Sequence, residues 1–135
     1  MKKIVFPGLV AGVVLLIISY AGLYLSIQFF PKLVEEFYNP IFYPGEDRTL
    51  LYFIHPFVLS FALAWFWERF KEMFKGSFVV RGFELGIVYG IVATLPAMWI
   101  TFSAINVSLS MVVTWFIYGL AQATLAGLIY AKMNP

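Results

Sequence analysis

The sequence predicts an all-α fold, an integral membrane four-helix bundle with its N and C termini in the cytoplasm. Its composition is 62% hydrophobic and 12% charged, whereas soluble domains carry about 25% charged residues. The nine Lys and Arg and seven Asp and Glu leave three stretches without charge, 4–31, 49–67 and 85–131. A charge at the centre of a bilayer costs roughly 2.5–3.5 kcal/mol on insertion scales. This distribution is therefore typical of a chain that has lipid as its solvent.

The lengths of the uncharged stretches indicate the number of spans. A helix needs about 20 apolar residues to cross a hydrocarbon core about 30 Å thick. The first two stretches each suffice for one span, and the third, with 47 residues, suffices for two spans and a tight turn. The N-terminal run exceeds the roughly 7–15-residue core of a signal peptide, so we interpret it as a span. We predict a single transmembrane domain over 1–135, with helices at about 5–29, 50–67, 82–103 and 107–131.

Positive charge is divided unequally between the two sides of the predicted bundle. If the spans alternate in direction, seven cations lie on the side of the termini, and Lys32 and Arg48 lie on the other. Cytoplasmic loops carry an excess of Lys and Arg, so we assign the seven-cation side to the cytoplasm. This predicts a multi-pass protein of the cell inner (cytoplasmic) membrane. The seven cations are Lys2, Lys3, Arg69, Lys71, Lys75, Arg81 and Lys132.

The predicted outer loop contains a candidate interfacial segment at 31–38. Its apolar residues are Leu33, Val34, Phe37 and Tyr38, and its two acids are Glu35 and Glu36. We expect a short helix that presses the apolar residues into the lipid interface and turns the acids to water.

Two prolines predict local features of the helices. Pro7 is tolerated in the first turn of a helix, so the first helix is expected to begin near Phe6. Pro96 removes the helical hydrogen bond to the carbonyl of Val92, and a kink is expected there. The hydroxyl of Thr94 could satisfy the freed carbonyl.

Small residues recur every four positions on the third and fourth predicted helices. In lipid, helices associate through close van der Waals contact, which small residues permit. The simplest arrangement has the two ridges facing one another, and the alternative is that one of them forms a dimer interface. The helix-packing residues are Gly82, Gly86, Gly90 and Thr94 on one helix and Gly119, Ala123, Gly127 and Ala131 on the other.

His55, the only histidine, precedes Pro56 on the second predicted helix. It could ligate a metal or haem, with Met98 or Met111 as a second ligand, or it could carry a proton. We favour a neutral imidazole that is hydrogen-bonded inside the bundle.

Several polar side chains are predicted at similar depth in the outer half of the bundle. If they converge, they form a small polar pocket under the outer loop, able to hold water or a ligand head group. The alternative, which we favour, is a set of hydrogen bonds between helices, worth about 0.6 kcal/mol each. The candidate pocket residues are Tyr24, Gln28, His55, Thr101 and Ser103.

The residue types present restrict the function. The chain has no Cys, which excludes thiol chemistry, disulfides and Cys-ligated metal centres, and nothing pairs a nucleophile with a base. We expect no enzymatic activity, no cofactor, no metal site and no nucleic-acid partner. The leading hypothesis is a non-enzymatic protein of the lipid bilayer that acts as a homo-oligomer or as an accessory subunit of a membrane complex. The alternative is a small transporter or a binder of lipid or another hydrophobic ligand that uses the outer pocket near His55.

Overall fold

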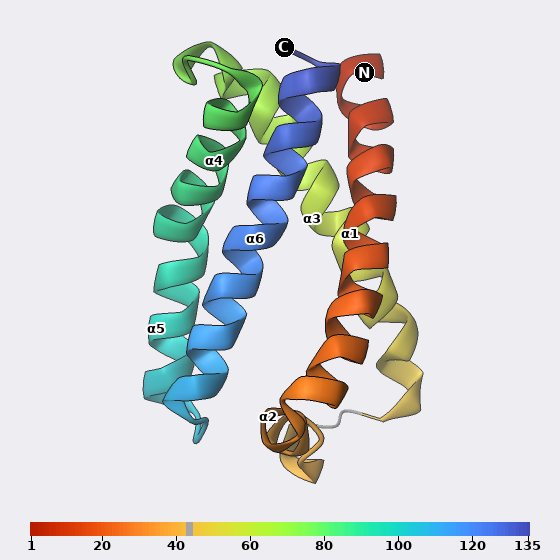
Figure 1. Ribbon diagram of the computed structural model, residues 1–135, viewed down its shortest axis with the longest axis vertical. Helices are drawn as coiled ribbons and strands as arrows, with labels where there is room; N and C mark the ends of the chain where they lie inside the picture. The colour runs from red at the N-terminus through yellow and green to blue at the C-terminus, as the bar shows by residue number, and fades with distance from the viewer. Residues whose placement is uncertain (43–44) are drawn as a thin grey trace.

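The computed structural model describes residues 1–42 and 45–135, which form helices and no strand (Figure 1). The first long helix is α1 (Lys2–Phe29) and the second is α3 (Thr49–Phe70). The third consists of α4 (Phe78–Tyr89), a π-helical turn (Gly90–Thr94) and α5 (Leu95–Ala104), and the fourth is α6 (Leu109–Met133). The short elements are α2 (Pro31–Phe37) and 3₁₀ turns at Pro40–Phe42, Glu46–Arg48 and Lys71–Met73.

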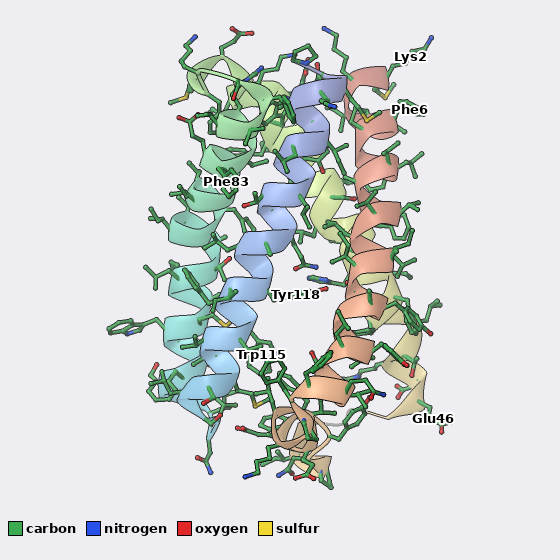
Figure 2. The ribbon with its side chains drawn as sticks, in the orientation of Figure 1. Lys2, Phe6, Glu46, Phe83, Trp115 and Tyr118 are labelled. Carbon is green, nitrogen blue, oxygen red and sulfur yellow. The ribbon has the colours of Figure 1, made fainter. Side chains whose placement is uncertain are left out.

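Within the described residues, four helical stretches are long and apolar enough to cross a membrane. The all-helical fold is confirmed. Both termini lie at the same end of the bundle, and Glu46 lies at the opposite end from Lys2 (Figures 1 and 2). The outward surface is apolar: Phe6 and Phe83, for example, are exposed and project away from the bundle (Figure 2). The four stretches are Lys2–Phe29, Glu46–Met73, Phe78–Ala104 and Leu109–Met133.

The helices pack as two close pairs, α1 with α3 and α4 with α6. Helix α6 also contacts α1, α3 and α5, so it joins the pairs. Helices α1 and α6 lie side by side near the termini and diverge toward the end that carries α2 (Figure 1). The largest core cluster joins α1, α3, α4 and α6 and contains the fully buried side chains of Leu15, Trp67, Leu85 and Tyr130.

The α4–α6 contact is built on glycines. A β-carbon added at Gly82 would lie 2.8 Å from the backbone nitrogen of Leu128, and one at Gly127 would lie 2.8 Å from the carbonyl oxygen of Gly82. At Gly86 and Gly90 the added carbon would meet side chains of α6. The predicted glycine ridges therefore face one another within the chain, so they give no reason to expect a dimer.

Two members of the α6 ridge differ in their surroundings. Gly119 faces Thr94, because a β-carbon there would lie 3.3 Å from its hydroxyl oxygen. Ala123 is fully buried in the core cluster that also contains Ala11 and Leu15 of α1. A four-residue repeat advances by more than one full turn, so successive members drift around the helix from one neighbour to the next.

The α1–α3 contact also depends on small residues. A β-carbon at Gly8 would lie 2.7 Å from the ring of Phe61, and one at Gly12 would lie 2.5 Å from the ring of Phe57. The buried hydroxyl of Ser60 donates to the carbonyl of Gly8 at 2.9 Å. This pair of helices therefore has both a glycine groove and a polar contact at its centre.

The first helix begins earlier than predicted, at Lys2, so Pro7 lies inside α1 rather than in its first turn. Pro7 has no N–H, and the helical bond from it to the carbonyl of Lys3 cannot form. The buried side chain of Asn134 donates to that carbonyl at 3.2 Å. The C-terminal segment thus satisfies an acceptor that the proline leaves free.

Asn134 holds three elements together at the end of the bundle with the termini. Its Nδ2 donates to Glu68 at 2.6 Å, and its Oδ1 accepts from the Lys71 ammonium at 2.7 Å. Glu68 and Lys71 form an ion pair at 3.1 Å, and the indole of Trp67 donates to the Asn134 carbonyl at 2.8 Å. These contacts join α1, α3 and the segment after α6.

The third long helix contains a π-helical turn just before Pro96. Pro96 has no N–H to donate to the carbonyl of Val92, and the wider turn accommodates the loss of this hydrogen bond. The prediction that Thr94 would satisfy the freed carbonyl is wrong, because its buried hydroxyl has no hydrogen-bond partner among the described residues. The hydroxyl faces Gly119 of α6 instead.

Candidate functional site

The five predicted pocket residues have different surroundings in the structure. Tyr24 and Gln28 of α1 and His55 of α3 are exposed. The hydroxyl of Thr101 donates to the carbonyl of Ala97, and that of Ser103 to the carbonyl of Trp99, so both bond within α5. None of the five lines the α1–α3 cavity described below, and the pocket that they would form stays a prediction. The predicted hydrogen bonds between helices are not made by these two hydroxyls either.

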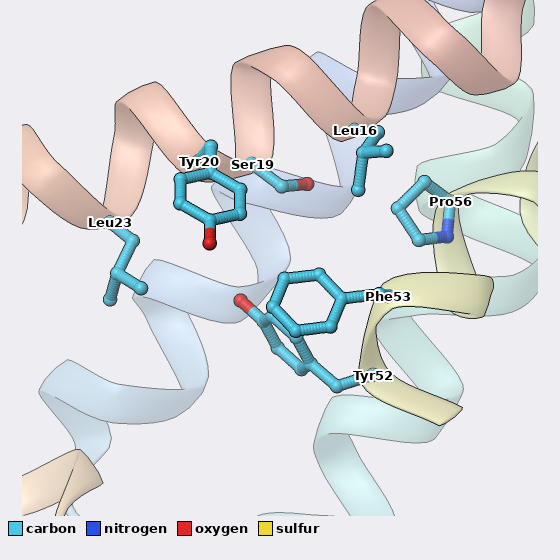
Figure 3. Close-up of a pocket in the computed structure, with 7 residues that line it drawn as sticks. All are labelled: Leu16, Ser19, Tyr20, Leu23, Tyr52, Phe53 and Pro56. Carbon is cyan, nitrogen blue, oxygen red and sulfur yellow. The ribbon is translucent and has the colours of Figure 1, made fainter. Parts of the chain in front are cut away.

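A cavity of about 80 Å³ lies between α1 and α3 in the half of the bundle away from the termini (Figure 3). We call it the α1–α3 cavity. It is partly enclosed. Tyr20 and Tyr52 line it and are also exposed on the surface of the protein. It includes Pro56, which follows His55 of the predicted pocket directly. Its lining residues are Leu16, Ser19, Tyr20, Leu23, Tyr52, Phe53 and Pro56.

Aromatic packing defines the wall of the α1–α3 cavity. The rings of Tyr20 and Phe53 are stacked with centroids 5.7 Å apart, and Tyr52 meets Phe53 edge-on at 5.4 Å. Such pairs are worth about 0.5–1.5 kcal/mol beyond their area burial. Three rings from two helices therefore support one another, and the hydroxyls of Tyr20 and Tyr52 point into the space between α1 and α3 (Figure 3).

Pro56 interrupts the backbone hydrogen bonds of α3 beside the cavity. Pro56 has no N–H, so the helical bond from residue 56 to the carbonyl of Tyr52 cannot form. Both residues line the cavity. An unsatisfied backbone group in lipid costs several kcal/mol, so a donor is needed at this position.

Ser19 connects the cavity with α6. Its hydroxyl donates to the carbonyl of Leu15 at 2.8 Å and contacts the hydroxyl of Tyr118. Because the single proton of Ser19 is used on Leu15, Tyr118 is the donor to Ser19. This contact joins the α1–α3 pair to α6.

Gln122 lies one helical turn from Tyr118 on α6 and is 3% exposed. Its Nε2 has no hydrogen-bond partner among the described residues. A buried polar group without a partner costs about 1–3 kcal/mol. The interior of the bundle therefore holds an unpaired donor close to the Ser19–Tyr118 contact.

Helix α2 covers the end of the bundle away from the termini. The ring of Phe37 stacks on Trp115 of α6 at 5.9 Å, and the Glu36 carboxylate accepts from the N–H of Ser108 at 3.2 Å. Val34 is buried, whereas Tyr38 is exposed. The short helix at 31–38 thus turns part of its apolar face to α6, although the whole face was expected to meet lipid.

The residues that line the α1–α3 cavity were not predicted from the sequence, and the reason is the choice of helix face. The sequence marks Pro56 as a helix irregularity and places Tyr20 with Tyr24 on one face of the first helix. The structure uses Leu16, Tyr20 and Leu23, three positions that share a face through spacings of four and seven. The helical hydrogen bond that Pro56 cannot donate to the carbonyl of Tyr52 is the one sequence feature that indicates Tyr52.

His55 is exposed, and the side chain of Met111 is buried. No cluster of three or more His, Cys, Asp or Glu that could hold a metal ion occurs among residues 1–42 and 45–135. The cavity is therefore lined by three residues with hydroxyl groups, Ser19, Tyr20 and Tyr52, and by four apolar residues.

Comparisons with protein-family models, with curated proteins and with solved structures find no match for this chain.

Proposed function

We propose that this chain is a non-enzymatic, multi-pass protein of the cytoplasmic membrane that binds a hydrophobic ligand in the α1–α3 cavity. The observation that carries the proposal is the cavity itself. Pockets for small hydrophobic molecules are concave, mostly apolar and equipped with a few placed polar groups. The α1–α3 cavity has apolar and aromatic walls, three hydroxyl-bearing side chains and no charged residue.

The proposed orientation places both termini in the cytoplasm. Its support is the excess of cations at the end that carries the termini, since short cytoplasmic loops are rich in Lys and Arg. In this orientation the α1–α3 cavity lies in the outer leaflet. A ligand would reach it from the bilayer past the exposed rings of Tyr20 and Tyr52.

The proposal is tested by extracting the purified protein with organic solvent and comparing it with a variant whose cavity is filled, Leu16→Trp. The result expected is a hydrophobic molecule that co-purifies with the unmodified protein and is absent from the variant. The matched control is Leu9→Trp, because Leu9 is exposed on the same helix and does not line the cavity. Equal recovery from the unmodified protein and Leu16→Trp would refute the proposal.

A second candidate function is that of an accessory subunit or homo-oligomer. One observation favours it: α5 has no buried residue, and Trp99 on this helix is 76% exposed. A partner helix on α5 would cover this surface. The test is the molecular mass of the protein in mild detergent, measured both for recombinant protein and for protein purified from its own membrane. A monomer without bound subunits under both conditions would refute this candidate.

A further inference from the structure

Three cations lie over aromatic rings at the end of the bundle that carries the termini. Two of these pairs are exposed: Arg69 with Trp65, and Lys132 with Phe78. We propose that the two exposed pairs bind the head groups of anionic phospholipids. This inference concerns the lipid that surrounds the protein, and it does not depend on a ligand in the α1–α3 cavity.

Positive charge is in excess at this end of the bundle. The segments there contain seven Lys and Arg residues and three Glu residues, whereas the segments at the opposite end contain two Lys and Arg residues and four acids. Among the described residues, Lys71 forms an ion pair with Glu68, and the other six cations of this end form none. Clusters of Lys and Arg at the membrane surface attract anionic lipids, so the partner that complements this end carries negative charge.

The third cation–aromatic pair lies inside the protein and shows what the two exposed pairs lack. The Cζ of Arg81 lies 4.9 Å from the ring centroid of Trp67, which is buried, and its Nη2 donates to the carbonyl of Lys71 at 3.2 Å. The guanidinium of Arg81 thus has an acceptor within the chain. The side chains of Arg69 and Lys132 are exposed and donate to no acceptor among the described residues, so their N–H groups are available to a partner outside the chain.

The Arg69 pair combines a phosphate-binding group with a ring that is typical of the membrane interface. Arg69 lies in the last turn of α3, and its Cζ is 5.1 Å from the ring centroid of Trp65, which is 50% exposed. Trp is enriched at the level of the lipid head groups. A guanidinium can stack on an aromatic ring and still form two parallel hydrogen bonds to a phosphate. Arg69 would therefore hold the phosphate while Trp65 contacts the apolar part of the lipid.

The Lys132 pair is formed between two helices. Lys132 lies in the last turn of α6, and its Nζ is 4.9 Å from the ring centroid of Phe78, the first residue of α4. A cation in the last turn of a helix also interacts favourably with the helix dipole, but that interaction does not require an exposed ring beside the cation. An ammonium binds phosphate as a compact charge. This pair, like the first, places a cation beside an apolar ring.

The experiment measures lipid binding to the purified full chain in mild detergent by native mass spectrometry. The chain is titrated with phosphatidylglycerol and with phosphatidylcholine that carry the same acyl chains, so that only the head groups differ. We expect two binding steps in which phosphatidylglycerol binds at least fivefold more tightly than phosphatidylcholine. One cation near an anionic lipid surface accounts for about this factor.

Substitutions test the two pairs. Arg69→Gln and Lys132→Gln are each expected to weaken one of the two phosphatidylglycerol steps about fivefold, and the double variant is expected to weaken both. Trp65→Leu keeps the charge of Arg69 but removes the ring, and it is expected to weaken one step at least twofold. Arg48→Gln is the matched control, because Arg48 is an exposed arginine at the opposite end of the bundle, and it is expected to leave both steps unchanged.

The outcomes that would overturn the proposal are distinct. Equal binding of the two lipids would overturn it, as would a preference for phosphatidylglycerol that survives in the double variant. An equal loss in Arg48→Gln, or no loss in Trp65→Leu, would show that net charge and not the cation–aromatic pairs binds the lipid. Leu16→Trp, which fills the α1–α3 cavity, is expected to leave both steps unchanged, so this proposal and the cavity proposal can fail separately.

Discussion

Adding a methyl group at Gly127 tests the α4–α6 contact directly. In Gly127→Ala the new β-carbon would lie 2.8 Å from the carbonyl oxygen and 2.9 Å from the Cα of Gly82. The first distance is 0.6 Å short of the 3.4 Å at which ordinary contact begins. Both atoms belong to the backbone of α4, which cannot rotate away as a side chain can. The two helices must therefore separate, and other contacts along their seam are lost.

The magnitude follows from two opposing effects. Overpacking of a well-packed interior costs about 1–3 kcal/mol, whereas Ala is favoured over Gly inside a helix by about 0.5–1 kcal/mol. We expect Gly127→Ala to destabilise the protein by about 0.5–2 kcal/mol. Gly22→Ala is the matched control, because nothing lies within 4 Å of the added carbon, and it is expected to stabilise by up to about 1 kcal/mol.

The assay is thermal unfolding in mild detergent, followed by tryptophan fluorescence. A difference of 1 kcal/mol shifts Tm by about 4 °C for a chain of this size, so the two variants are expected to differ by about 2–12 °C. Gly119→Ala should fall between them, since its added carbon meets the side chain of Thr94 at 3.3 Å. A Gly127→Ala protein as stable as Gly22→Ala would refute the packing described for α4 and α6.

Three further predictions concern other contacts. Asn134→Ala removes side-chain bonds to Lys3, Glu68 and Lys71 and is expected to cost about 1–3 kcal/mol, measured by the same unfolding assay; an unchanged Tm would contradict the role of Asn134. Tyr130→Phe loses the buried bond to the carbonyl of Ser60 at 2.6 Å and should cost about 1–3 kcal/mol, with a loss under 0.5 kcal/mol contradicting it. Phe37→Ala removes the stack on Trp115 and should increase proteolysis within the loop 31–48; cleavage at the unmodified rate would count against closure of the outer end by α2.

The helical fold could be predicted from the sequence because lipid imposes a simple rule on charge. All sixteen charges lie outside the three apolar stretches, and the helices follow those stretches. The glycine seam could also be predicted, because Gly82, Gly86 and Gly90 have no other use in a membrane helix than close approach. Gly8 and Gly12 form a similar contact with α3, although they make up a shorter repeat.

The candidate site could not be predicted in the same way. The depth of a residue along a helix can be counted from the sequence, but the direction in which each polar side chain points depends on how the four helices are arranged. His55 and Tyr24 were placed inside by depth and are exposed, whereas Ser19 and Tyr52 line the cavity. The arrangement depends on long-range contacts, such as Ser19 with Tyr118 and Phe37 with Trp115, which no local pattern encodes.

The measurement that tests the account most directly is the accessibility of the two ends of the bundle across a membrane. The chain has no Cys, so single cysteines at Glu46 and Lys75 can be labelled with a maleimide that does not cross membranes. In intact cells we expect Glu46→Cys to be labelled from outside and Lys75→Cys to be labelled only after lysis, because α3 crosses the bilayer between them. Labelling of both positions from the same side would contradict the membrane-spanning bundle and, with it, the outer-leaflet site.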